Sequence, residues 1–226
     1  MANDVIRFKE VVSFGWKAFK KNALIFIVLL IISFAANLIV SVITGAASFP
    51  AVIASILATA VGSYFALSMT RASYAAVEGS AVSWEVLKKQ WQPYFRFFII
   101  FILLSIIFVI SAILLIIPLL FTFPLFLCVP FIFVENPQIG IIEVFQKSWN
   151  ISIKHVFPIM LYVILCFLII FATTLLTLGL ALLITIPLFY ITSAYIYKRL
   201  NAAYAGREIP IVTFQEAPAA DDPETK

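Results

Sequence analysis

The stretch that decides the fold runs from Asn22 to Thr70, NALIFIVLLIISFAANLIVSVITGAASFPAVIASILATAVGSYFALSMT, and has no charged residue over 49 positions. A helix needs roughly 20 apolar residues to cross the hydrocarbon core of a bilayer, so this stretch is long enough for two crossings. Helix-breaking residues stand near its middle, between Gly45 and Pro50. Because backbone polar groups cannot stay unpaired in lipid, we expect the turn at the membrane surface. The stretch therefore predicts a transmembrane hairpin.

Two further uncharged stretches, 97–134 and 156–197, repeat this pattern over 38 and 42 residues. Pro118 and Pro124 lie near the middle of the first, and residues 177–179 lie near the middle of the second. The fourth span is short and contains two prolines, Pro124 and Pro130, so it is expected either to be kinked or to start nearer Pro118. Six transmembrane helices in three hairpins are therefore expected, near residues 23–44, 51–72, 97–117, 120–134, 156–176 and 179–198.

The composition also places the chain in a membrane. Its 226 residues are 64% hydrophobic and 12% charged, with a mean hydropathy of +1.12, whereas soluble domains carry about 25% charged residues. The net charge of +4 suits the surface of an anionic membrane and requires no nucleic-acid partner. Cys128 and Cys166 lie inside apolar runs, and His155 has no Cys or His at ligand spacing. We therefore expect no metal and no cofactor.

The basic residues predict the orientation. All 15 Lys and Arg fall in the two terminal segments and in the connections 71–96 and 135–155, and none falls in the three opposite turns. Basic loops favour the cytoplasmic side, so both termini are expected to be cytoplasmic, in the inner membrane of a prokaryote. We expect a single transmembrane domain over residues 1–205. The polar, acidic and proline-spaced segment 206–226 is expected to be a disordered tail.

A threefold repeat is visible before the hairpins. The segments Trp16–Lys21, Trp84–Lys89 and Trp149–Lys154 each place a tryptophan five residues before a lysine, and the tryptophans are 68 and 65 residues apart. Self-similarity of this kind predicts a repeated structural unit. Each unit would be a cytoplasmic amphipathic helix that lies in the membrane interface, with tryptophan at headgroup level and lysine toward water, followed by a hairpin. The parallel repeats would cover about 5–72, 83–134 and 137–198.

These interfacial helices admit two interpretations. They can anchor the bundle and do nothing more, or they can form a cytoplasmic collar that binds lipid headgroups or a protein partner. The second repeat's helix is the shortest of the three, with Pro93 at its expected end.

The second predicted span carries a small residue at every fourth position, which places these residues on one face of the helix. They are Ala54, Ala58, Gly62 and Ala66. Small residues let a neighbouring helix approach closely, so we expect this face to pack against another helix in the centre of the bundle.

Few polar groups fall within the predicted spans. Asn37 in the first span and Thr185 in the sixth could hydrogen-bond to other helices or contact a solute. At the cytoplasmic end of the fourth span, Glu135 could pair with Arg96 or Lys154, or simply mark the end of the helix. The hydrocarbon core is predicted to hold no charged residue, which argues against ion-coupled transport and acid–base catalysis.

Four segments carry a family resemblance: the Trp-x-x-Phe-Lys-Lys motif at 16–21, the proline-punctuated hairpin 117–134, Glu135-Asn136-Pro137, and Val144–Trp149. Together they resemble a group of uncharacterised prokaryotic integral membrane proteins, including the membrane domain attached to some glycerophosphodiester phosphodiesterases. The similarity covers most of residues 10–200. It implies the fold and membrane residence, but the phosphodiesterase domain is missing here, so no catalytic residue carries over.

Function is therefore a choice between hypotheses. The leading one is a non-enzymatic polytopic membrane protein that organises or handles lipid or another hydrophobic molecule, with membrane lipid as its partner. The alternative is a permease for a small neutral or amphipathic solute, or the membrane subunit of an exporter. The permease predicts a polar cavity near Asn37 and Thr185.

Overall fold

The computed structural model describes residues 8–46, 50–80, 82, 91–114 and 116–207. Within these residues all regular structure is helical, as the long uncharged stretches predict. The elements are α1 (Phe8–Ala46), α2 (Ala51–Val77), α4 (Trp91–Ile113), α5 (Ile116–Phe126), α6 (Val129–Glu135), α7 (Ile141–Ser152), the 3₁₀ turn η2 (Ile153–His155), α8 (Val156–Leu176) and α9 (Leu182–Tyr204).

Five helical stretches are long and apolar enough to cross a membrane. They are Phe8–Gly45, Ala51–Val77, Pro93–Ile113, Pro118–Glu135 and Ile141–Leu176. The expected sixth span corresponds to α9, which is not among the five and carries Lys198 and Arg199 near its end. A helical fold whose described helices include several able to cross a membrane is thus confirmed, while the crossing by α9 stays a prediction.

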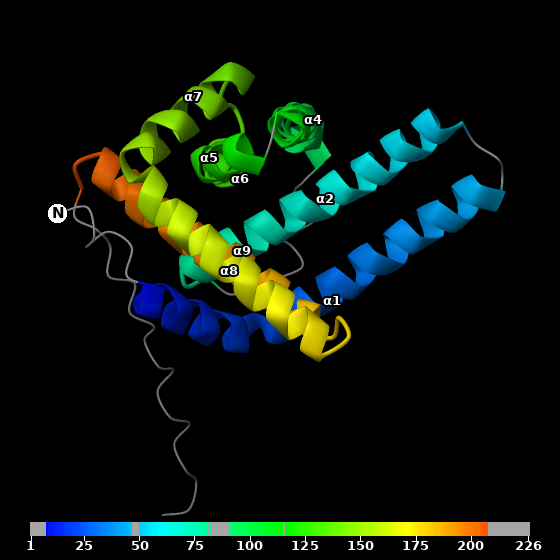
Figure 1. The fold of residues 1–226 in the computed structure, drawn as a ribbon, viewed down its shortest axis with the longest axis horizontal. Helices are drawn as coiled ribbons and strands as arrows, with labels where there is room; N and C mark the ends of the chain where they lie inside the picture. Colours follow the sequence, from blue (N-terminus) through cyan, green and yellow to red (C-terminus); the bar gives the residue numbers. More distant parts are fainter. Residues whose placement is uncertain (1–7, 47–49, 81, 83–90, 115, 208–226) are drawn as a thin grey trace, which may run out of the picture.

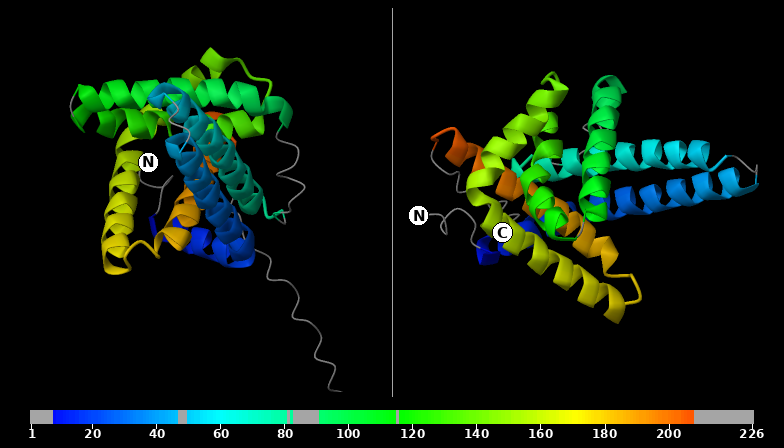
Figure 2. Two further views of the ribbon diagram at one scale, coloured as in Figure 1. Left: turned by 90° about the vertical axis from the view of Figure 1, so that its right-hand side faces the viewer. Right: turned by 45° about the horizontal axis from the view of Figure 1, so that its top comes forward.

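The described helices include three pairs, α1 with α2, α4 with α5 and α8 with α9, that diverge from a common centre (Figures 1 and 2). Helices α1 and α2 run side by side to one tip, α4 and α5 run across them, and α8 and α9 extend to a third tip. Side chains toward the tips are exposed, including Phe34 at 72% and Leu178 at 96%. Most of the apolar surface of these tips therefore faces outward and not another helix.

The common centre, called the hub here, consists of the second half of α2, helix α6 and the second half of α9. Its core includes the buried runs 131–133 and 194–197, and α1 and α7 pack against it. Gly15 of α1 lies against α9 so closely that an added Cβ would sit 2.4 Å from Cγ2 of Thr192. The protein is therefore held together at one end of its hairpins.

The second hairpin departs from the expected boundaries. Helix α4 ends at Ile113 and α5 begins at Ile116, so the turn comes before Pro118. Pro118 lies in the first turn of α5, where a missing backbone N–H costs nothing because that group has no partner within the helix. The kink expected in the fourth span is confirmed as a break between α5 and α6, next to Pro130.

The segments expected to lie in the interface differ from one another. In the first repeat α1 continues into the hairpin, with a kink at Asn22, whose Nδ2 donates to the Ala18 carbonyl at 3.1 Å. In the third repeat α7 is a separate helix, joined to α8 by η2. The second lies mainly at 83–90, outside the described residues. Pro93 does not end a helix there, since it lies in the first turn of α4.

Candidate functional site

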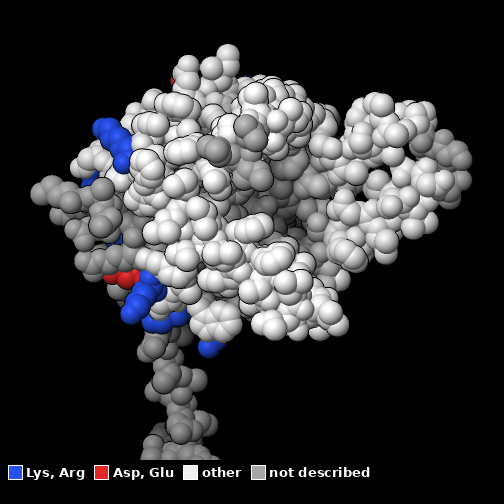
Figure 3. Space-filling view, viewed as in Figure 1, with Lys and Arg blue, Asp and Glu red and all other residues white. Residues whose placement is uncertain are grey.

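The charges of the described residues gather at the hub. In Figure 3 Lys and Arg lie on the left-hand side of the view, while the right-hand half, where α1 and α2 reach their tip, shows neither blue nor red. We call the side of the molecule that carries these residues the charged end. The charged residues visible in this view, which come from separate parts of the sequence, therefore lie on one side of the molecule, next to the hub.

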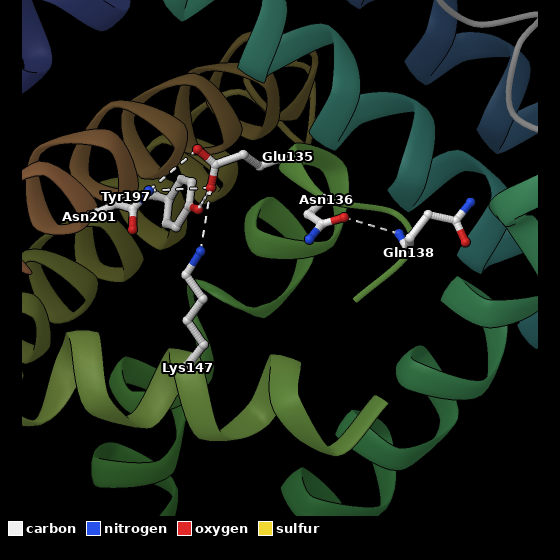
Figure 4. Close-up of polar contacts among 6 residues, drawn as sticks. All are labelled: Glu135, Asn136, Gln138, Lys147, Tyr197 and Asn201. Carbon is white, nitrogen blue, oxygen red and sulfur yellow. Dashed lines mark hydrogen bonds and ion pairs between the residues drawn. The ribbon is translucent and has the colours of Figure 1, made fainter. Parts of the chain in front are cut away.

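Glu135, the last residue of α6, is the centre of a polar cluster at the charged end (Figure 4). Its carboxylate accepts hydrogen bonds from the Tyr197 hydroxyl and from Nδ2 of Asn201, the latter at 3.2 Å. The Lys147 ammonium lies 3.8 Å from the same carboxylate. The cluster joins α6 to α9 and α7, and the Glu135 side chain is still 35% exposed.

The expected ion pair between Glu135 and Arg96 is not formed. The Arg96 guanidinium donates instead to the Pro137 carbonyl at 3.3 Å and to Oε1 of Gln138 at 3.2 Å. Asn136 shapes this turn, because its Oδ1 accepts the Gln138 backbone N–H at 3.3 Å. Arg96 therefore ties the start of α4 to the α6–α7 turn, and Glu135 bonds to α7 and α9 instead.

The end of α9 binds acidic residues from three other elements. Next to Tyr197, Lys198 pairs with Glu78 at 2.8 Å and Arg199 pairs with Glu10 at 2.9 Å. Exposed ion pairs contribute only about 0.2–1 kcal/mol each. Their main contribution is to position helices, because one turn of α9 contacts the charged ends of α1, α2 and α6.

An apolar cavity of about 150 Å³ lies inside the hub, between α2, α4, α5, α6 and α9. Phenylalanine dominates its wall, at positions 97, 101, 108, 123, 126, 131 and 189. One of these rings, Phe131, stacks on Tyr197 with centroids 5.9 Å apart. Tyr197 therefore connects the wall of the hub cavity with the Glu135 carboxylate.

A groove of about 790 Å³ separates α2 from α4. Phe101 lies in the wall of both this groove and the hub cavity, so the two spaces are neighbours. The groove's polar residues are Ser55, Thr59 and Ser105, and each donates to a carbonyl of its own helix. The surface that the groove offers to a ligand is therefore apolar.

The small residues of α2 face these spaces and not a tightly packed helix. Ala58 and Gly62 line the groove, Ala66 lines the hub cavity, and Ala54 is half-buried on the same helix. A Cβ added at Gly62 would meet no atom within 4 Å. The expected close helix packing at this face is wrong at Gly62. The central position of α2 is confirmed by its packing on α1, α4, α6 and α9.

Two of the three predicted Trp/Lys pairs fall in the described residues. Trp16 is 42% exposed and Trp149 is 45% exposed. Lys21 and Lys154 are also exposed. The Lys20 ammonium lies 5.4 Å from the centre of the Trp16 ring. The third pair, Trp84 and Lys89, lies outside the described residues.

The two predicted intramembrane polar residues bond to their own helices. Asn37 donates to the Ser33 carbonyl at 2.9 Å, and Thr185 donates to the Ala181 carbonyl at 3.0 Å. The structure gives no contact between these two side chains within the described residues. Their expected role as a shared polar lining therefore gains no support.

The sequence reasoning missed a face of α7 that is buried against the hub, formed by Val144, Ser148, Ile151 and Ser152. The Ser148 hydroxyl donates to the Leu125 carbonyl at 2.7 Å, close to the break between α5 and α6. The spacing of Val144, Ser148 and Ile151 is helical and could have indicated this second face. It was obscured by the more apolar stripe that contains Trp149.

A polar contact that joins α8 to α9 was also missed. The Tyr162 hydroxyl lies 2.5 Å from Oγ1 of Thr192, and both side chains are buried. Their separation of 30 residues gives no local sequence signal. In the described part of the chain, no group of three or more His, Cys, Asp or Glu is placed to hold a metal ion.

Comparisons of this chain with family models, with curated proteins and with solved structures find no match. The resemblance suggested by residues 16–21, 117–137 and 144–149 therefore stays a prediction.

Proposed function

We propose that this chain is a non-enzymatic protein of a prokaryotic cytoplasmic membrane that holds a lipid acyl chain between its hairpins. In this proposal the charged end is cytoplasmic and α9 supplies the sixth span. The three repeats each combine an interfacial segment with a hairpin. The diverging hairpins leave lateral openings that lipid enters.

The observation that carries the proposal is the pair of neighbouring apolar spaces. A cavity of about 150 Å³ lined by apolar side chains stays dry and accepts a ligand of the size of benzene. The adjoining groove of about 790 Å³ falls within the range of small-molecule sites. A flexible hydrocarbon chain can lie in the groove and place a short segment in the hub cavity.

The groove is also continuous with the outer apolar surface of the helices. Ile56, Ile106 and Val109 line it and are 55%, 48% and 57% exposed. In a membrane these side chains face lipid, so the groove fills from the surrounding bilayer. Its hydroxyl groups are already bonded to their own helices, which favours a hydrocarbon chain over a polar solute.

Two glycines provide a matched test, because a Cβ at either Gly62 or Gly45 would meet no atom within 4 Å. Gly62 lines the groove, whereas Gly45 lies near the tip of α1. The full chain, carrying Gly62→Trp or Gly45→Trp, would be purified from membranes, and native mass spectrometry would count the lipids retained. We expect fewer retained lipids in Gly62→Trp and an unchanged number in Gly45→Trp. Equal lipid retention by both variants would contradict the proposal.

The interfacial segments are tested separately. In the proposal Trp16 and Trp149 lie among headgroups at the cytoplasmic surface. Variants that retain one tryptophan would be placed in bilayers that contain lipids brominated at known depths. If lipids brominated near the headgroups quench the tryptophan fluorescence most strongly, the collar is supported. If lipids brominated near the bilayer centre quench it most strongly, the collar is excluded. A protein partner on this collar would instead shield both tryptophans from the lipid.

A further inference from the structure

The two helices that form the groove each contain a single charged residue, and in both helices it is an arginine. Arg71 is the only charge in α2, and Arg96 is the only charge in α4. Both arginines are next in the chain to residues that line the hub cavity. Thr70 precedes Arg71, and Phe97 follows Arg96.

These arginines differ from the basic residues of α7 and α9. Lys147, Lys198 and Arg199 each have a glutamate partner. Arg96 donates to neutral acceptors, and within the described residues no carboxylate forms an ion pair with Arg96 or with the half-buried Arg71. The two helices that form the groove therefore carry two positive charges that no carboxylate of the described residues pairs with.

Arg96 lies beside one end of the α4 wall of the groove. With a rise of about 1.5 Å per residue, Phe98 lies about 3 Å from Arg96 along α4, and Ile110 lies about 21 Å from it. Because α4 runs across α2 (Figures 1 and 2), these are lengths along the wall of the groove and not depths in a bilayer. One leaflet supplies roughly half of a hydrocarbon core about 30 Å thick. The α4 wall beyond Arg96 is therefore long enough for an acyl chain of one leaflet.

We infer that the occupant is an anionic phospholipid, with its phosphate at Arg71 and Arg96 and an acyl chain in the groove. Guanidinium groups bind phosphate oxygens with charge-assisted hydrogen bonds. The inference rests on the proposed function, because it gives the headgroup for the same site. It adds that the site selects lipid by charge.

The test uses the full chain in nanodiscs that contain equal amounts of phosphatidylglycerol and phosphatidylcholine. Native mass spectrometry gives the ratio of the two lipids that remain on the protein. We expect the wild type to retain phosphatidylglycerol preferentially. Arg71→Gln and Arg96→Gln should each lower the ratio about fivefold, or by about 1 kcal/mol, because each removes a guanidinium contact to the phosphate.

Lys17→Gln is the matched control, because it removes one exposed positive charge from α1, away from the groove. Its ratio should equal that of the wild type, and a decrease as large as in the arginine variants would overturn the inference. Arg71→Lys and Arg96→Lys should keep most of the preference. If a glutamine variant does not fold, the lysine variants still test the inference. Loss of the preference in a folded lysine variant would overturn phosphate binding by charge.

The failure of this inference is distinguishable from failure of the proposed function. An Arg71→Gln/Arg96→Gln double variant that retains as many lipids as the wild type, with an unchanged ratio, overturns the anionic headgroup alone. Retention of the same number of lipids with a ratio near one supports both ideas. Gly62→Trp tests the acyl chain independently, since it leaves both arginines in place.

Discussion

The charged end and the hairpin tips are built from similar apolar residues, but they are held in place differently. At the hub, Phe131 is 2% exposed and packed between helices, whereas Phe34 near the tip of α1 is 72% exposed. Between helices in lipid, packing and polar contacts drive association, because lipid tails are as apolar as leucine. The difference indicates that packing at the hub, and not at the tips, fixes the structure.

The largest difference in stability is expected between two separate Phe→Ala variants, one at the hub and one toward a tip. Phe131→Ala should lower the free energy of unfolding by about 3 kcal/mol, because it removes a buried ring and its stacking on Tyr197. Phe34→Ala should change it by less than about 0.5 kcal/mol. Unfolding by SDS in mixed micelles, followed by circular dichroism, measures both. Equal effects would contradict the division between hub and tips.

A second comparison uses two glycines of different surroundings. Gly15→Ala should destabilise the protein by about 2 kcal/mol, because its Cβ would clash with Thr192 and push α1 away from α9. Gly62→Ala meets no atom within 4 Å and should leave stability unchanged or raise it slightly, because alanine is the better helix former. The same SDS titration compares them. A stable Gly15→Ala variant would mean that α1 does not approach α9 this closely.

The next largest loss of stability is expected when the polar cluster around Glu135 is disrupted. Glu135→Ala removes the acceptor of Tyr197 and Asn201 and the partner of Lys147, at a cost of about 1.5–2 kcal/mol. Glu135→Gln keeps an acceptor oxygen and should cost less. Thermal unfolding of the purified variants ranks their stability. An alanine variant as stable as the wild type would show that the cluster does not stabilise the fold.

The smallest effect is expected for the exposed ion pair Lys198–Glu78. A double-mutant cycle with Lys198→Ala and Glu78→Ala should give a coupling energy of about 0.2–1 kcal/mol. The coupling should decrease as salt is added, because exposed charges are screened over about 10 Å at 0.1 M ionic strength. A coupling that does not respond to salt would indicate contact through the Tyr74 ring, which the Lys198 ammonium also approaches at 4.7 Å.

Much of the fold could be predicted from local sequence. The break between α1 and α2, the turn at residues 177–179 and the break in the fourth span follow from glycine and proline positions, and charge predicts which end is polar. The partners of Glu135 could not be predicted in this way. They lie 12 residues away at Lys147 and about 60 residues away at Tyr197 and Asn201. Such partners depend on which helices become neighbours.

The prediction of close helix packing on the small-residue face of α2 was wrong at Gly62 for a related reason. Small residues at every fourth position allow close approach, but they do not specify that a helix arrives. At Ala58 and Gly62 the diverging α4 leaves a groove. The sequence pattern is the same for a packed helix and for an open groove, so only the direction of the neighbouring helix α4 separates the two outcomes.

The end of α9 has a consequence for biosynthesis. A ribosome makes the chain from the N-terminus, so Glu10, Glu78 and Glu135 are all synthesised before Tyr197, Lys198, Arg199 and Asn201. The first two hairpins therefore enter the bilayer before the turn that binds their acidic ends exists. Final assembly waits for α9, and a translation product that stops before residue 197 lacks the turn that joins the three hairpins.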